Sequence, residues 1–82
     1  MVDVPKQPDV VFIFWAKNPL HPKSFRKIQQ VSIVGTASPC KQFLTPGTAL
    51  FRARRCLLSN GFKIVCERNI TGVNGFIVFE RV

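Results

Sequence analysis

Seven consecutive apolar residues, Val10 to Ala16, restrict the fold of this chain more than any other feature. The run is rich in β-branched and aromatic side chains, which favours a strand. It is far shorter than the roughly 18–20 apolar residues that cross a bilayer. Because the run is apolar on both faces, the strand needs cover on both sides or a central place in its sheet. The rest of the chain must supply neighbouring strands.

The segment that follows the prolines after this run is less clearly patterned. Apolar and polar residues alternate in its second half, which favours a strand from about residue 26 to 34. Ser24 and the residues after it also fit one helical turn, so residues 25–30 stay open between a strand and a helical turn. Residues 35–42 are small and polar and include a proline, which indicates a connecting loop.

One helix is predicted, beginning at Thr45 and ending at Gly61. A Thr-Pro pair places a capping oxygen and a proline where a helix tolerates them, and Gly61 suits the left-handed residue after the last turn. At 100° per residue, the inward face consists of Ala49, Leu50, Ala53, Cys56 and Leu57. Arg52 and Arg55 point outward, and Arg54 falls at the margin between the two faces.

Two further strands are predicted after the helix, at residues 62–67 and 76–81. Asn74-Gly75 lies between them and is a strong hairpin signal, because both residues tolerate positive φ. In the first of these strands Phe62, Ile64 and Cys66 are expected to share one face.

The order of elements is therefore β-β-α-β-β, which predicts a small single α+β domain. One helix is expected to pack on one face of an antiparallel sheet of three or four strands. The domain is predicted to span residues 10–82, after a flexible leader at residues 1–9. A chain of 82 residues hides only about 60–65% of its unfolded surface, which leaves no room for a second domain.

The three cysteines bear on the compartment. Their odd number leaves one thiol unpaired, and secreted domains of this size usually carry more cysteines. We therefore expect a reduced, cytoplasmic environment. The acidic, proline-bearing N-terminus and the shortness of the longest apolar run predict no signal peptide and no membrane contact. Cys56 and Cys66 are predicted to be small buried apolar residues, and Cys40 an exposed thiol.

The sequence has few side chains that could serve as a general acid or base, since only four are carboxylates. Asp3 and Asp9 lie in the leader. Glu67 and Glu80 lie on neighbouring strands, where they are expected to be solvated and paired with Lys63, Arg68 or Arg81. His21 is the only histidine, and it could serve a metal-free ribonuclease, but no tyrosine is present as a second proton-transfer group. The cysteines and His21 lack the usual metal-ligand spacings, so we expect no enzyme activity, metal or cofactor.

Positive charge is the remaining signal, since 12 Lys and Arg residues against four Asp and Glu give a net charge of +8. It concentrates around the first turn and on the outer surface of the helix. Arginines on a helix can follow a phosphate backbone and make bidentate contacts to it. The predicted nucleic-acid-binding residues are Arg52, Arg54, Arg55, Lys23, Arg26 and Lys27.

The leading hypothesis is thus a small, non-enzymatic protein that binds DNA or RNA through phosphate contacts. The basic-aromatic pattern that marks a sheet stacked on single-stranded bases is absent, because Phe12, Phe14, Phe76 and Phe79 lie in apolar strands. The second hypothesis is a protein-interaction module that docks its basic face on an acidic protein. In that case the apolar strand at Val73 to Val82 could also pair by its edge, including in a homodimer. The ribonuclease built on His21 is the third.

Overall fold

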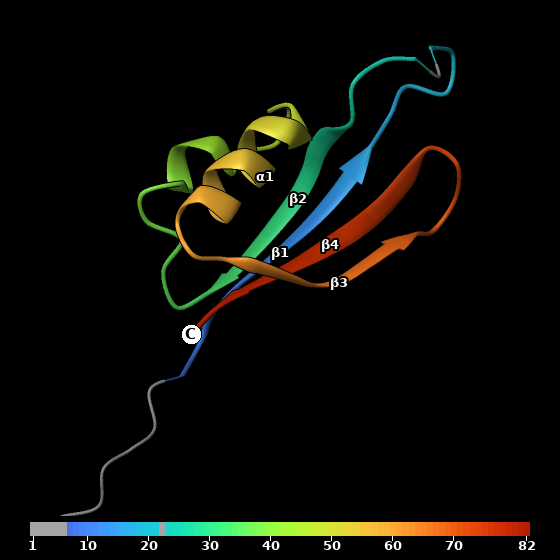
Figure 1. Cartoon of the computed structure of the whole chain (residues 1–82). Coiled ribbons are helices and arrows are strands. Elements are labelled where there is room, and N and C mark those ends of the chain that lie inside the picture. Colours follow the sequence, from blue (N-terminus) through green and yellow to red (C-terminus); the bar gives the residue numbers. More distant parts are fainter. Residues whose placement is uncertain (1–6, 22) are drawn as a thin grey trace, which may run out of the picture.

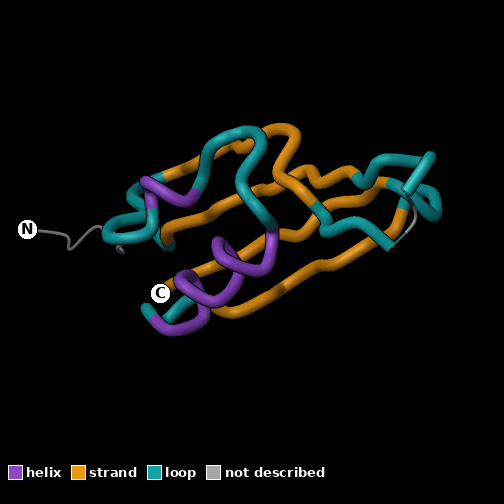
Figure 2. Tube along the Cα trace, turned by 90° about the horizontal axis from the view of Figure 1, so that it is seen from above, coloured by secondary structure: helices purple, strands orange, loops and turns teal. Residues whose placement is uncertain are grey.

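Within residues 7–21 and 23–82, which the computed structural model describes, one α-helix covers one face of a four-stranded sheet. The strands are antiparallel neighbours in the order β2-β1-β4-β3. Figures 1 and 2 show α1 lying along one side of that sheet. The elements are β1 (Asp9–Ala16), β2 (Lys27–Val34), the 3₁₀ helix η1 (Lys41–Phe43), α1 (Leu50–Ser59), β3 (Lys63–Asn69) and β4 (Asn74–Arg81). The predicted α+β class is confirmed.

The apolar run at the start of the chain is the inner strand β1, which pairs with β2 on one side and β4 on the other. Val11, Ile13 and Trp15 point toward α1 and are fully buried. Phe12 and Phe14 alternate with them on the opposite face, where they are half-buried. The central position explains why the run is apolar on both faces. Residues 1–6 of the predicted leader lie outside the described residues. β1 begins at Asp9, the last residue of that predicted leader.

The hydrophobic core fills the space between α1 and the sheet. Leu50, Ala53 and Leu57 are the fully buried residues of α1, in agreement with the predicted inward face. They meet Ile77 and Phe79 of β4 as well as the buried residues of β1.

The helix begins five residues later than predicted. A turn at residues 45–48 precedes it, in which the hydroxyls of Thr45 and Thr48 lie 2.9 Å apart. The backbone after this turn bonds to the start of β2: the Ile28 N–H donates to the Thr48 carbonyl, and the Leu50 N–H donates to the Arg26 carbonyl, both at 2.8 Å. Pairing with a distant segment therefore replaces the first predicted helical turn. The predicted end is confirmed, because Gly61 has a φ of 89°.

β2 runs through most of the ambiguous residues 25–30, which settles them in favour of a strand. The pairing with β1 shifts between Phe14 and Trp15, whose partners are Gln30 and Ile28. A bulge at residue 29 therefore interrupts the alternation, which explains why the sequence pattern is unclear there.

The hairpin between β3 and β4 does not use Asn74-Gly75 as its turn, since both residues belong to β4. The turn precedes them, and the Thr71 hydroxyl and Asn74 side chain lie 2.6 Å apart across it. The Ile70 N–H also donates to the Asn74 carbonyl at 3.0 Å. The prediction of the hairpin is confirmed, but the position of its turn was wrong.

β4 then continues as a central strand between β1 and β3, so the predicted free edge at the end of the chain is also wrong. The edges are β2 and β3.

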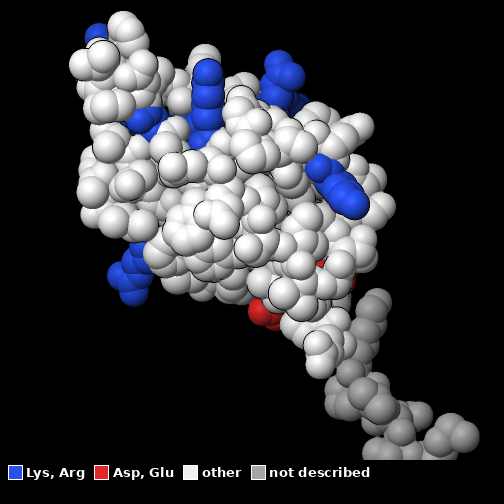
Figure 3. Space-filling model, turned by 180° about the vertical axis from the view of Figure 1, so that it is seen from behind, with Lys and Arg blue, Asp and Glu red and all other residues white. Residues whose placement is uncertain are grey.

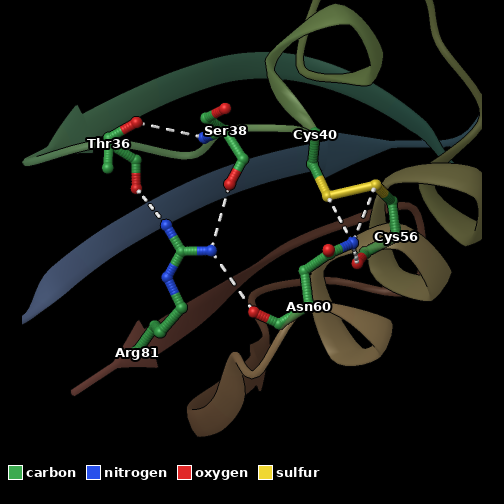
Figure 4. Close-up of a disulfide and its surroundings, with 6 residues drawn as sticks. All are labelled: Thr36, Ser38, Cys40, Cys56, Asn60 and Arg81. Atoms are coloured by element: carbon green, nitrogen blue, oxygen red, sulfur yellow. Dashed lines mark hydrogen bonds between the residues drawn. A yellow bond between two sulfur atoms is a disulfide. The ribbon is translucent and has the colours of Figure 1, made fainter.

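Cys40 and Cys56 form a disulfide that ties the loop after β2 to α1 (Figure 4). Cys40 is fully buried, so the prediction of an exposed thiol was wrong, and Cys56 is not a simple apolar residue. Cys66 is the free cysteine. It lies opposite Val78, on the face away from α1, because the β3 pairing shifts between Ile64 and Cys66. The prediction that Cys66 shares the inner face with Ile64 was therefore also wrong.

Arg81, near the end of β4, connects three parts of the molecule that are distant in sequence. Its guanidinium forms an ion pair with Asp9 of β1, with nitrogen–oxygen distances of 3.0 Å. It also donates to the backbone carbonyls of Thr36, Ser38 and Asn60 at 3.0–3.3 Å, as Figure 4 shows. Its partner is therefore Asp9, in contrast to the predicted pairing with Glu67 or Glu80.

We expect Arg81→Lys to lower the free energy of unfolding by about 2 kcal/mol, because one ammonium cannot serve the several acceptors that the planar guanidinium reaches. Urea unfolding, followed by the fluorescence of the single tryptophan, Trp15, measures this loss. Arg68→Lys is the matched control at an exposed position of β3, and it should change stability by less than about 0.5 kcal/mol. Equal effects of the two substitutions would contradict the role given to Arg81.

Candidate nucleic-acid interface

A pocket of about 210 Å³ lies where the start of β2 meets the start of α1. Hydrogen bonding of the Leu50 N–H to the Arg26 carbonyl holds the two segments together. We call this site the helix-side pocket, and its lining residues are Phe25, Arg26, Leu50, Phe51 and Arg54. Two of the six predicted binding residues, Arg26 and Arg54, therefore share one site, although Arg26 directly precedes β2 and Arg54 lies in α1.

Two exposed phenylalanines distinguish the helix-side pocket from an ordinary basic surface. Phe25 is 70% exposed and Phe51 is 51% exposed, although their ring centroids lie only 5.5 Å apart. The Arg26 guanidinium lies over the Trp15 ring, 4.3 Å from its centroid, which holds the arginine beside them. Exposed ring faces and guanidinium groups together can stack a base and contact a phosphate. Phe25 and Phe51 are not among the predicted binding residues, and their sole signal in the sequence is their position next to predicted site arginines.

The three arginines of α1 do not act as one cluster. Arg54 turns toward β3, where it lies 4.0 Å from the Glu67 carboxylate in a half-exposed ion pair. Arg52 and Arg55 line a second depression on the other side of the helix, together with Phe43 and Ser59. Spacing of three residues brings Arg52 and Arg55 together, whereas Arg54 lies on a different side of the helix.

The predicted lysines lie apart from the helix-side pocket. Lys23 is exposed in the loop before β2. Lys27 pairs with Ala16, one step along from the buried pair of Trp15 and Ile28, so it points to the face opposite α1. The six predicted residues are therefore spread over several surfaces.

Most of the predicted cations are available to an external anion. Among the residues that the structure describes, Lys23, Lys27, Arg52 and Arg55 form no ion pair. The ion pair of Arg54 is exposed and contributes little to stability. In the view of Figure 3, Lys and Arg side chains stand apart around the margin, and acidic atoms appear only at the lower end. The surface in this view therefore carries an excess of separated positive charges.

The candidate catalytic groups are not brought together. Glu67 lies opposite Ile77, whose side chain is buried beneath α1, whereas Glu80 lies opposite Lys63 and points to the other face. His21 is exposed in a turn, where its backbone N–H donates to the Asn18 carbonyl at 3.0 Å. The part of the chain that the structure describes contains no group of three His, Cys, Asp or Glu residues that could hold a metal ion.

Protein-family models, curated proteins and solved structures give no match to this chain. In residues 7–21 and 23–82, α1 is too short and too polar to cross a membrane, and no longer helix is found.

Proposed function

We propose that this protein binds nucleic acid without catalysing a reaction on it, and that the helix-side pocket is its primary contact. The observation that carries this proposal is the pair of exposed rings, Phe25 and Phe51, beside Arg26 and Arg54. The guanidinium groups would bind phosphate oxygens, and the rings would stack against a base. The net charge of +8 attracts a polyanion over longer distances.

The remaining predicted cations would extend the contact along the nucleic-acid strand. Arg52, Arg55 and Lys23 are exposed, so each can neutralise one phosphate without first losing a partner. Such contacts raise affinity without sequence preference, and they make binding strongly dependent on salt.

The double variant Arg26→Gln, Arg54→Gln tests this proposal. We expect it to bind a fluorescein-labelled 12-nucleotide single strand about tenfold more weakly, as measured by fluorescence anisotropy. The slope of log affinity against log salt should also decrease in magnitude by about 1.4, because two phosphate contacts are lost.

The matched control is Lys41→Gln, Lys63→Gln, which removes the same charge at two exposed positions outside the pocket. It should change the salt slope by much less. If the control weakens binding as strongly as the pocket variant, the attraction is general and the helix-side pocket is not the site.

An acidic protein partner is the alternative occupant of the same basic residues. Copurification discriminates between the two, because a nucleic-acid complex absorbs strongly at 260 nm and loses its partner after nuclease treatment. Recovery of one stoichiometric protein from nuclease-treated lysate would favour the interaction module.

The cytoplasmic localisation remains a proposal. The disulfide between Cys40 and Cys56 weighs against the reduced environment from which that localisation was predicted, because structural disulfides persist mainly in oxidising compartments. The number of free thiols in protein isolated from its own cells decides between a reduced and an oxidising environment.

A further inference from the structure

The sheet face opposite α1, called here the open face, carries an aromatic platform on its two central strands. Phe14 of β1 pairs with Phe76 of β4, and Phe12 pairs with Val78 in the next position on this face. The Phe12 and Phe76 rings are stacked with centroids 5.2 Å apart, and the Phe14 centroid lies 4.8 Å from that of Phe12. All three rings remain partly accessible to solvent. They therefore present a connected aromatic surface.

Polar and basic side chains border this platform on both sides. On the β2 side, Gln30 lies opposite Phe14 and Ser32 opposite Phe12. On the β3 side, Arg68 lies opposite Phe76. Lys27 lies one step further along the same face, opposite Ala16. The platform is therefore flanked by hydrogen-bonding groups on one side and by a guanidinium on the other.

From this arrangement we propose that the open face binds single-stranded nucleic acid, with bases stacked on Phe12, Phe14 and Phe76 and phosphates contacted by Arg68 and Lys27. This inference rests on the proposed function and adds a second contact surface to it. Unpaired bases can lie flat on exposed aromatic rings, and every base offers such a face. A duplex cannot use this platform, because its bases are already stacked inside the helix.

Charge favours a nucleic acid over a second copy of the chain as the occupant of the open face. Each copy carries a net charge of +8, so a dimer through this face would bring like charges together. The cations that border the platform, Arg68 and Lys27, are exposed. They form no ion pair among the described residues. A polyanion neutralises these charges, whereas a second copy adds to them.

The variant Phe12→Leu, Phe76→Leu tests the inference, since leucine keeps apolar volume but removes the aromatic rings. With an eight-nucleotide oligothymidine probe, we expect the dissociation constant to rise at least about fivefold, the lower bound for loss of one stacked base. The salt slope should remain unchanged, because no phosphate contact is removed. A blunt-ended duplex of two complementary strands, which has no unpaired bases, should bind the variant and the wild type equally.

The matched control is Val34→Ala, a non-aromatic change at an exposed position of the same face, and it should leave both probes unaffected. Thermal unfolding followed by Trp15 fluorescence shows whether each variant is folded. If the folded phenylalanine variant binds oligothymidine as tightly as the wild type, the open face does not stack bases.

The two proposals fail in distinguishable ways. Weakened binding in the Arg26 and Arg54 variant alone supports the helix-side pocket and overturns the open-face inference. Weakened single-strand binding in the phenylalanine variant alone supports the open face and overturns the pocket as the primary contact. A wild-type dimer that becomes monomeric in the phenylalanine variant, without oligothymidine binding, would make this face an interface between copies and overturn the inference.

Discussion

The substitution Gly75→Ala is expected to destabilise the protein by about 3 kcal/mol or more, although it adds a single methyl group. A Cβ atom on Gly75 would meet the backbone carbonyl oxygen of Arg68 across the β3–β4 ladder. It would also lie 2.7 and 2.9 Å from two carbons of the Trp15 indole. The carbonyl is fixed in the sheet and Trp15 is only 1% exposed, so neither neighbour can move without disrupting the core.

Gly72→Ala is the control, because no atom beyond Gly72 and its two chain neighbours lies within 4 Å of the position that its Cβ would occupy. It should leave the midpoint of thermal unfolding nearly unchanged, while Gly75→Ala lowers it by more than about 10 °C. A Gly75→Ala protein with the stability of the Gly72→Ala protein would show that β4 can withdraw from Trp15 at little cost.

Reduction of the disulfide is expected to lower the free energy of unfolding by about 3 kcal/mol, which is typical of a crosslink that closes a short loop. Cys40 and Cys56 are separated by 16 positions. The bond holds the buried Cys40 and its loop against α1, and near it the Asn60 amide donates to the Cys56 carbonyl at 2.8 Å. Without the bond, the loop regains conformational freedom in the unfolded state.

Urea unfolding with and without dithiothreitol measures this loss. The Cys40→Ser, Cys56→Ser variant should be less stable and indifferent to the reductant, whereas Cys66→Ser should respond to it as the wild type does. Titration of the denatured wild type, prepared without reductant, should find one reactive thiol. Three reactive thiols and no response to dithiothreitol would contradict the disulfide and favour the cytoplasmic prediction.

The order of elements could be predicted because it depends on local patterns. The apolar run at residues 10–16 predicted a strand that is either covered on both faces or central in its sheet, and the spacing of Leu50, Ala53 and Leu57 predicted the buried face of the helix. Gly61 marked the end of that helix through its backbone conformation alone. Each of these signals lies within one turn or one strand, so the sequence contains all the information that it requires.

Errors arose where distant segments compete with local preference. The Thr45-Pro46 pair is a local helix-start signal, but the start that it predicted was wrong, because backbone bonds to residues 26 and 28 delay the helix until Leu50. Glycine is a residue type typical of turns, yet Gly75 lies in β4, where Trp15 packs against it. The bulge in β3 moves Cys66 to the opposite face from the one that simple alternation gives.

Composition and local patterns are enough to give the excess of positive charge, the α+β order and the residue types available for binding. Which of these residues meet depends on the packing of separate elements: Arg26 and Arg54 lie beside two exposed rings, and Arg81 pairs with Asp9. Phe12, Phe14 and Phe76 share the uncovered face of the sheet, whereas Phe79 is buried beneath α1. The physical reason is that periodicity fixes which side chains of one element share a face. Only the packing of separate elements fixes which faces are covered and which charges remain available.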